Sequence, residues 1–157
     1  MKVARITMRP CQQLRRLGPK NYIGYRVNGD TVEHYVTTRS GGHVKLRLRC
    51  DDCFFAKLVK SSYIVSPPVL HDGYIRFLAV YTNAVRRLVS RHKDQLLSID
   101  IMDSRNVILT DKQRAVFRLI SRSGHRPSTI ARNWGVSRTA VHKTIKTALR
   151  KIAVMLS

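Results

Sequence analysis

Several short segments in the first two thirds of the chain alternate apolar and polar residues, or are rich in β-branched and aromatic residues, as β-strands are. We predict strands over residues 2–8, 22–27, 31–37, 43–49, 74–81 and 98–102. Asn28-Gly29-Asp30 lies between two of these strands and is a strong hairpin signal. Along His43–Arg49 the alternation places three aliphatic residues on one face and three cations on the other.

Apolar residues spaced three and four positions apart predict helices over residues 10–17 and 83–97. Ser66-Pro67-Pro68 is expected to break any element that precedes it, because proline lacks the amide hydrogen. The order of elements is strand, helix, several strands, and then strand, helix, strand. We therefore expect an α+β protein with an N-terminal α/β sandwich, for which a ferredoxin-like arrangement is one option, followed by a C-terminal all-α helix-turn-helix domain.

The polar segment Asp103-Ser104-Arg105-Asn106 marks the expected boundary between these two domains. Residues 1–106 would form the N-terminal α+β domain, with a role in dimerisation, ligand sensing or accessory DNA contact. Residues 107–157 would form the helix-turn-helix DNA-binding domain. Basic residues are denser beyond the boundary, where residues 110–157 hold eleven Lys and Arg against a single Asp.

Helical periodicity in the second domain predicts a supporting helix and a shorter helix after it. Thr110 is a suitable N-cap for the supporting helix, and its apolar stripe is Val116, Phe117, Leu119 and Ile120. The shorter helix opens near Ser128 and ends at Gly135, a residue suited to the left-handed C-cap. Its expected inward residues are Ile130, Ala131 and Trp134.

A third helix is expected from Ser137, with an apolar stripe of Val141, Ile145, Leu149 and Ile152. Its opposite face carries hydrogen-bond donors in the N-terminal half, which is the part of a recognition helix that enters the major groove. The predicted DNA-binding residues are Ser137, Arg138, Thr139, His142, Lys143 and Lys146, together with Lys112, Arg126 and Ser128 from the two preceding helices.

The charge balance points to a polyanionic partner. The 157 residues include 30 Lys and Arg against nine Asp and Glu, which gives a formal net charge of +21. Double-stranded DNA is the first candidate, because basic proteins release its condensed counterions on binding. No apolar span, lipidation signal or signal peptide is evident, so we expect no membrane partner and a cytoplasmic, nucleoid-associated protein.

The sequence offers few resources for catalysis, since Glu33 is its only glutamate and it has no nucleophile elbow, phosphate loop or His-Glu-x-x-His motif. We therefore expect neither an enzyme nor a cofactor. Cys50 and Cys53 have the spacing of zinc ligands, and Cys11, His34 or His43 could complete such a site. One such pair is weak evidence, so we predict no metal; a disulfide and two reduced cysteines are the alternatives, of which the second is the commonest case.

Four strings in the second domain carry a resemblance to a known family. They are Leu109-Thr110-Asp111-Lys112-Gln113-Arg114, Ile130-Ala131, Gly135-Val136-Ser137-Arg138-Thr139-Ala140-Val141 and Ala148-Leu149-Arg150-Lys151-Ile152. In order and spacing they resemble the helix-turn-helix of archaeal bacterio-opsin-activator-type regulators, and they are also similar to region four of bacterial sigma factors. The resemblance implies an archaeal transcription regulator with an α+β domain ahead of its DNA-binding unit.

Three functions are compatible with these observations. The first is a sequence-specific transcription regulator that works as a homodimer, with two recognition helices in half-sites about 34 Å apart. The second is an architectural nucleoid or chromatin protein that coats DNA with little sequence preference, which a basic charge over both domains favours. The third is an interaction module on RNA polymerase, to which the sigma-factor resemblance points.

Overall fold

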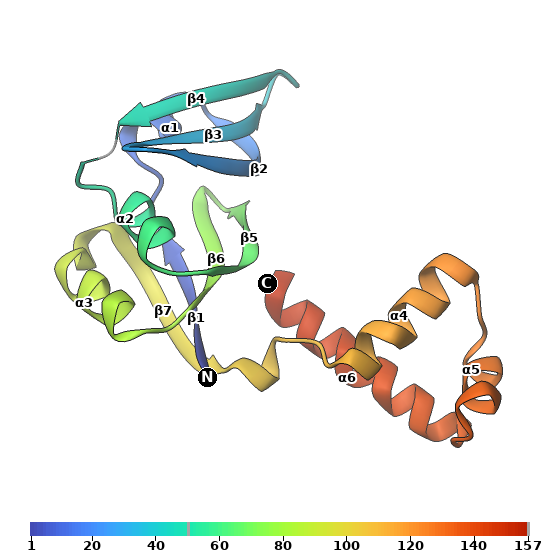
Figure 1. The fold of residues 1–157 in the computed structure, drawn as a ribbon. Coiled ribbons are helices and arrows are strands. Elements are labelled where there is room, and N and C mark those ends of the chain that lie inside the picture. Colours follow the sequence, from blue (N-terminus) through green and yellow to red (C-terminus); the bar gives the residue numbers. More distant parts are fainter. Residues whose placement is uncertain (50, 157) are drawn as a thin grey trace. The chain divides into compact units, whose positions relative to one another are not determined.

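The computed structural model describes residues 1–49 and 51–156, which form two compact units (Figure 1). Unit 1 is Met1–Asp103 and unit 2 is Ser104–Ser157. The strands of unit 1 are β1 (Lys2–Met8), β2 (Pro19–Asn28), β3 (Thr31–Thr38), β4 (His43–Arg49), β5 (Ile64–His71), β6 (Tyr74–Val80) and β7 (Leu96–Asp103). Its helices are α1 (Gln12–Arg16), α2 (Phe54–Ser61), α3 (Asn83–Arg91) and the short 3₁₀ helix η1 (Lys93–Gln95). Unit 2 comprises the 3₁₀ helix η2 (Ser104–Asn106), α4 (Asp111–Ser123), α5 (Pro127–Trp134) and α6 (Arg138–Leu156).

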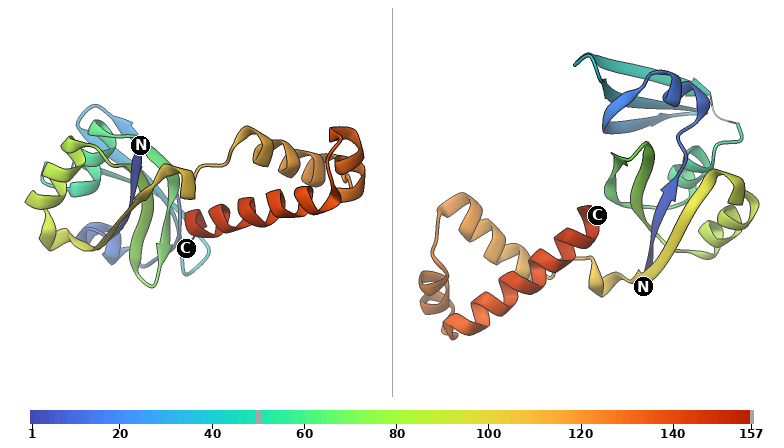
Figure 2. Two further views of the ribbon diagram at one scale, coloured as in Figure 1. Left: turned by 90° about the horizontal axis from the view of Figure 1, so that it is seen from below. Right: turned by 180° about the vertical axis from the view of Figure 1, so that it is seen from behind.

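A four-stranded antiparallel sheet forms the base of unit 1, with the strand order β5-β6-β1-β7 (Figure 2). The first strand of the chain is therefore central, and Ile6 lies opposite both Phe77 and Ile99. Ile6 and Phe77 are buried with Phe54 and Phe55 of α2 in one hydrophobic core. The alternation that predicted β1 thus reflects a strand with one face on this core.

A three-stranded antiparallel sheet, in the order β2-β3-β4, forms the rest of unit 1. Gly29 has a φ of 55° in the turn between β2 and β3, a conformation that favours glycine. Along β4, Val44 and Leu46 pack against the core, whereas Lys45 and Arg47 are exposed. The predicted alternation of this strand is therefore confirmed.

The expected N-terminal sandwich followed by an all-α helix-turn-helix domain is wrong as a description of the fold. The protein is α+β, with two separate antiparallel sheets and with helices interspersed among the strands. The physical reason lies in chain connectivity: β2, β3 and β4 are joined by short turns, so they pair with one another and do not extend the four-stranded sheet.

Ser66-Pro67-Pro68 does not break the chain as expected, because β5 runs through these residues. Pairing with β6 shifts register between Ile64 and Ser66 and again between Ser66 and Val69. The strand lies at the edge of its sheet, where proline is tolerated because an outward amide needs no partner strand. The hydroxyl of Ser66 also accepts a hydrogen bond of 3.0 Å from the amide of Leu78, which replaces a ladder contact.

Local sequence signals account for the ends of the helices in unit 2. The Thr110 hydroxyl accepts a 3.3 Å hydrogen bond from the Gln113 amide, and the Gln113 side chain accepts one of 2.9 Å from the Thr110 amide. Gly124 and Gly135, with φ values of 61° and 62°, are left-handed C-caps of α4 and α5. Pro127 occupies the first turn of α5, where no amide partner is needed.

The core of unit 2 forms where the three helices meet. Val116, Ile130, Ala131 and Val141 are buried there, and Leu119, Trp134, Val136 and Ile145 pack against them. Leu149 was expected in the apolar stripe of α6 but is 52% exposed, and Ala148 is buried in its place. Ile120 of α4 is likewise at the surface, with 36% of its area exposed. The close approach of the helices favours the small residue at 148 over the leucine beside it.

Candidate nucleic-acid interface

The corner between α5 and α6 fixes the direction in which α6 leaves the turn. The amide of Val136 donates a 3.0 Å hydrogen bond to the carbonyl of Ala131, which closes the end of α5 around Gly135. A Cβ atom at Gly135 would meet no atom within 4 Å, so its positive φ is what requires glycine there. The Ser137 hydroxyl then accepts a 3.1 Å hydrogen bond from the amide of Ala140 and caps α6.

The predicted recognition residues of α6 share one exposed helical surface. Arg138, His142 and Lys146 are spaced by four residues, so they follow one another along the helix, and Thr139 and Lys143 form the adjacent row. All five are exposed, whereas Val141 and Ala148 of the same helix are buried. We call these five residues the α6 face. It offers donors able to reach both base edges and phosphates.

The other four predicted residues lie at the ends of helices. Ser137 is exposed, but its hydroxyl is engaged as the N-cap of α6. Arg126 and Ser128 are exposed at the start of α5. Lys112 lies in the first turn of α4, where its Nζ is 5.8 Å from the ring centroid of Trp134. The structure therefore brings five of the nine together on α6 and places Lys112 beside Trp134.

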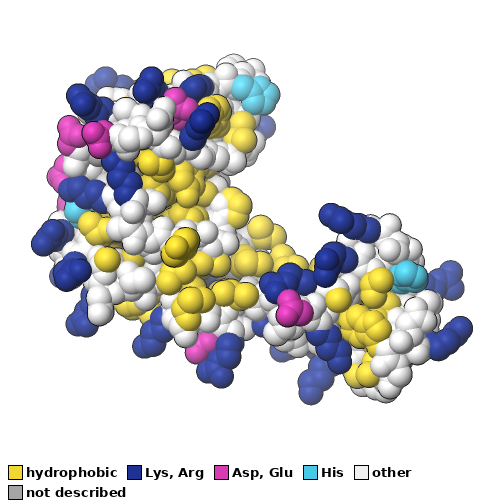
Figure 3. Space-filling model, in the orientation of Figure 1, with side chains coloured by type: hydrophobic (Ala, Val, Ile, Leu, Met, Phe, Trp, Pro, Cys, Tyr) yellow, Lys and Arg dark blue, Asp and Glu magenta, His cyan; other side chains and the backbone are white. Residues whose placement is uncertain are grey.

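Most of the positive charge of unit 2 has no acidic counterpart in its sequence. Residues 104–157 contain twelve Lys and Arg, and Asp111 is their only carboxylate side chain. Asp111 forms an ion pair with Arg114, three residues further along α4. Lys and Arg side chains accordingly dominate the charged surface of unit 2 that is visible in Figure 3. Such a surface attracts a polyanion and repels another copy of itself.

Sequence reasoning did not anticipate a hollow beside Trp134. It is lined by Asp111, Lys112, Ala115, Arg118, Trp134 and Val136. Three separate segments contribute to it, and no single periodic pattern contains them all. Trp134 is half-buried here rather than a fully enclosed core residue.

A second basic surface in unit 1 was also missed. Arg86, Arg87 and Arg91 are exposed on α3 and line a shallow pocket with Asn83 and Ser90. The spacing of these arginines within a predicted helix was visible in the sequence and could have revealed it.

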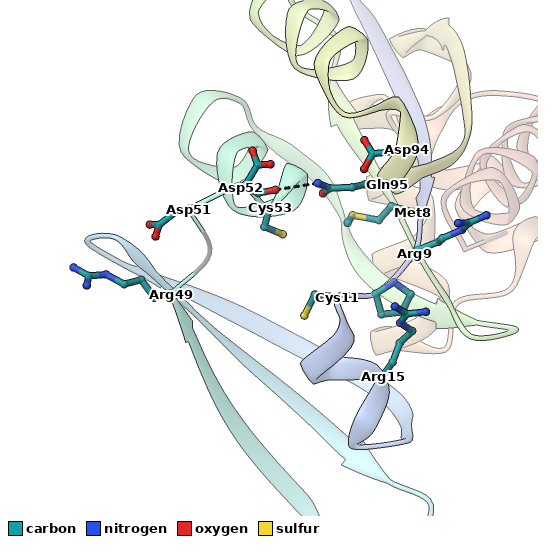
Figure 4. A pocket seen from close by; sticks show the side chains of 11 residues that line it. Met8, Arg9, Cys11, Arg15, Arg49, Asp51, Asp52, Cys53, Asp94 and Gln95 are labelled. Carbon is teal, nitrogen blue, oxygen red and sulfur yellow. Dashed lines mark hydrogen bonds between the residues drawn. The ribbon is translucent and has the colours of Figure 1, made fainter.

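The proposed zinc ligands fall partly outside the described residues, because Cys50 is one of the two positions that are not described. Cys11 and Cys53 precede α1 and α2 and line one pocket of unit 1 (Figure 4). His34 is buried with its Nδ1 against the Tyr22 hydroxyl, and His43 is exposed at the start of β4. Within residues 1–49 and 51–156, no three His, Cys, Asp or Glu side chains are grouped to hold a metal ion.

Charged and polar groups surround the two thiols in this pocket. Arg9, Arg15 and Arg49 line it together with Asp51, Asp52 and Asp94. A hydrogen bond from Lys57, at 2.7 Å, lowers the pKa of Asp52 below its usual value. The Gln95 side chain donates a 2.9 Å hydrogen bond to the carbonyl of Asp52 (Figure 4). It also accepts one of 2.9 Å from the amide of Phe54, and so fixes the start of α2. These contacts hold the start of α2 next to η1.

Comparison with protein families, curated proteins and solved structures gives no match for this chain. No helix in the described part of the chain is both long and apolar enough to cross a membrane.

Proposed function

We propose that unit 2 is a helix-turn-helix module that binds double-stranded DNA with the N-terminal half of α6 in the major groove, and that the protein regulates transcription. The α6 face carries this proposal: five exposed polar residues, without an acidic residue anywhere on the helix, follow a capped glycine turn. The function is one of binding rather than catalysis.

Each row of the α6 face suits a different part of a DNA duplex. Arginine and lysine can donate to O6 and N7 of guanine, and the methyl group of Thr139 can contact the methyl group of thymine. Cations further along the helix would meet phosphates and hold the helix in register. Arg126 and Ser128, at the start of α5, are placed on the helix that crosses the backbone in such modules.

The proposal can be tested by selecting duplexes from a random pool and measuring the affinity for selected and scrambled sequences at several salt concentrations. A regulator should prefer its selected site by about a thousandfold or more at physiological salt. Failure to enrich any sequence, with equal affinities for all duplexes, would contradict a sequence-specific function.

Two matched double variants then test the α6 face itself. Arg138→Ala with Lys143→Ala should weaken binding to the selected site about a hundredfold, because base and phosphate contacts are lost together. Arg118→Ala with Arg122→Ala removes the same charge from exposed positions of α4 and should weaken it only a few-fold. Equal losses in the two variants would show that α6 does not read the DNA.

An architectural function is the second candidate, and the arginines of α3 favour it. A protein that coats DNA gains from cations on both units, because each phosphate contact releases counterions. Replacing Arg86, Arg87 and Arg91 with glutamine should then reduce the salt dependence of binding as strongly as changes on α6 do. If the protein contacts DNA through α6 alone, these three substitutions should leave the salt dependence of DNA binding unchanged.

A module that binds RNA polymerase is the third candidate, and the hollow beside Trp134 favours it. Trp134 is half-buried beside the cations of Lys112 and Arg118, and tryptophan and arginine are enriched among the residues that anchor protein interfaces. Retention of polymerase by the immobilised protein, lost in Lys112→Ala with Arg118→Ala, would support this function.

A further inference from the structure

The two edges of the four-stranded sheet differ in how they are protected. At one edge, β5 carries Pro67 and Pro68, has two register shifts and also contacts β2 of the other sheet. At the other edge, β7 has one register shift, at Leu97, and then pairs with β1 in an unbroken register from Ser98 to Asp103; in the described chain it has no partner strand on its outer side. Proline and bulges are the usual means of blocking an edge, so β5 is closed to strand addition and β7 is open.

The edge strand β7 carries no positive charge. Its eight residues, LLSIDIMD, include no Lys or Arg, although the chain has 30 of them. Leu97 and Ile101 are 51% and 47% exposed, so two large aliphatic side chains of this one strand are left partly uncovered. For a chain with a net charge of +21, this edge is a place where two copies would meet with little repulsion.

We propose that β7 pairs antiparallel with β7 of a second copy of this chain, so that two four-stranded sheets become one continuous sheet. In the register that we propose, Ile99 lies opposite Ile99 of the second copy. Leu97 then lies opposite Ile101, and Ser98 lies opposite Asp100. The pairing covers the exposed apolar residues and gives the Asp100 carboxylate a hydroxyl donor.

Cross-strand pairing selects this register over its neighbours. Ile99 and Ile101 lie opposite Ile6 and Ala4 of β1, whose side chains face the core, so they share one face of the sheet. A register centred on Asp100 would place two carboxylates opposite each other, which is destabilising. A register centred on Ile101 would place Ile99 opposite Asp103 and leave Leu97 uncovered. Of these three registers, only the one centred on Ile99 pairs apolar with apolar residues and polar with polar residues from Leu97 to Ile101.

The first test is the oligomeric state of the full chain without DNA, by sedimentation equilibrium across the micromolar range. The mass should be twice that of one chain. Ile101→Lys should weaken self-association at least about tenfold, because a charge would lie within the apolar row. Ile23→Lys is the matched control: this isoleucine of β2 is 54% exposed, and its substitution should leave the dimer unchanged. A monomeric wild-type chain, or a dimer insensitive to Ile101→Lys, would overturn the proposal.

The second test fixes the register by disulfide cross-linking. Ser98→Cys and Asp100→Cys chains, mixed and mildly oxidised, should form the mixed cross-link, identified by mass spectrometry of the joined peptides. Directly opposite residues have Cα atoms close enough for a disulfide. Each variant alone should cross-link at this strand far less. Efficient cross-linking of Asp100→Cys to itself would overturn the register.

This inference does not rest on DNA binding, since both tests are made without DNA. A dimer that binds no DNA would refute the proposed function alone, and a monomer that binds a selected site would refute the β7 pairing alone.

Discussion

Both units are basic, but they differ in how their cations are compensated. In unit 1, Glu33 lies 3.2 Å from Lys45 and 4.0 Å from Arg47, and the Glu33 carboxyl has a lowered pKa chiefly because Lys45 donates a hydrogen bond to it. Asp52 contacts both Lys57 and His92. Unit 2 contains twelve Lys and Arg residues but only one carboxylate side chain, that of Asp111. The charge of unit 1 is therefore partly compensated by its own carboxylates, whereas unit 2 contains a single carboxylate side chain for its cations.

The two units also differ in the packing of their hydrophobic cores. The core of unit 1 combines strands of both sheets with α2 and includes three closely packed aromatic residues, Tyr25, Phe55 and Phe77. The core of unit 2 has four buried side chains at its centre, and two of them come from α5. Unit 2 should therefore be the less stable unit, and the two should unfold separately.

Truncating the core of unit 2 should have the largest effect on its stability. Ile130→Ala should lower the free energy of unfolding of unit 2 by about 4 kcal/mol, because it removes a buried side chain and leaves a cavity. Trp134 is the only tryptophan of the chain and all six tyrosines lie in unit 1, so the two units can be followed separately in denaturant by fluorescence and near-ultraviolet circular dichroism.

Leu149→Ala is the matched control for this truncation, because the sequence pattern makes Leu149 a core residue and the structure exposes it. Its effect should stay below about 1 kcal/mol. A loss as large as that of Ile130→Ala would show that Leu149 is buried in solution. A shift of the tyrosine signal in Ile130→Ala would show that the units unfold together.

Leu149 also shows how far the sequence could predict the fold. Strand alternation, the Asn28-Gly29 turn and the Thr110 cap are local, so their positions could be assigned without knowledge of tertiary contacts. Which residue of α6 faces the core, Ala148 or Leu149, depends on where α4 crosses it, and periodicity leaves that open. The partition into two sheets, and the passage of β5 through two prolines, likewise depend on pairing between distant segments.

The candidate site likewise has a part that the sequence could predict and parts that it could not. The α6 face was predictable because it consists of one helix and its cap, and spacing of three and four residues defines its surface. The hollow beside Trp134 combines α4, α5 and the turn that follows, so no local pattern reveals it. The β7 edge was predictable as a strand, but its open side became evident only from the strand order.

Acidification should destabilise unit 1, by less than the Ile130→Ala truncation destabilises unit 2. Burial lowers the pKa of His34 in unit 1 to about 4, from an ordinary value of 6.5. Because the unfolded chain then binds more protons than the folded one between these values, the stability of unit 1 is fully present above about pH 6.5 and falls as the pH approaches 4, by about 3 kcal/mol. Denaturant unfolding at several pH values, followed by the tyrosine signal, measures this loss.

His34→Asn removes the titrating group and keeps a polar side chain next to Tyr22. The variant should be less stable at neutral pH, but its stability should change little between pH 6.5 and 4.5. If wild type and variant show the same slope over this range, His34 is not the group that titrates.

The smallest effect concerns the turn that directs α6. Gly135→Ala should cost about 1 kcal/mol of unit 2 stability, because alanine resists a φ of 62° although space for its methyl group is available. Gly24→Ala in β2 of unit 1 also meets no atom within 4 Å and has no positive φ, so it should be neutral or slightly stabilising. Because the substitution at 135 strains the corner from which α6 emerges, it should weaken binding to a selected duplex more than the loss of folded protein accounts for. A variant that binds the duplex as tightly as wild type would show that the corner tolerates the strain without moving α6.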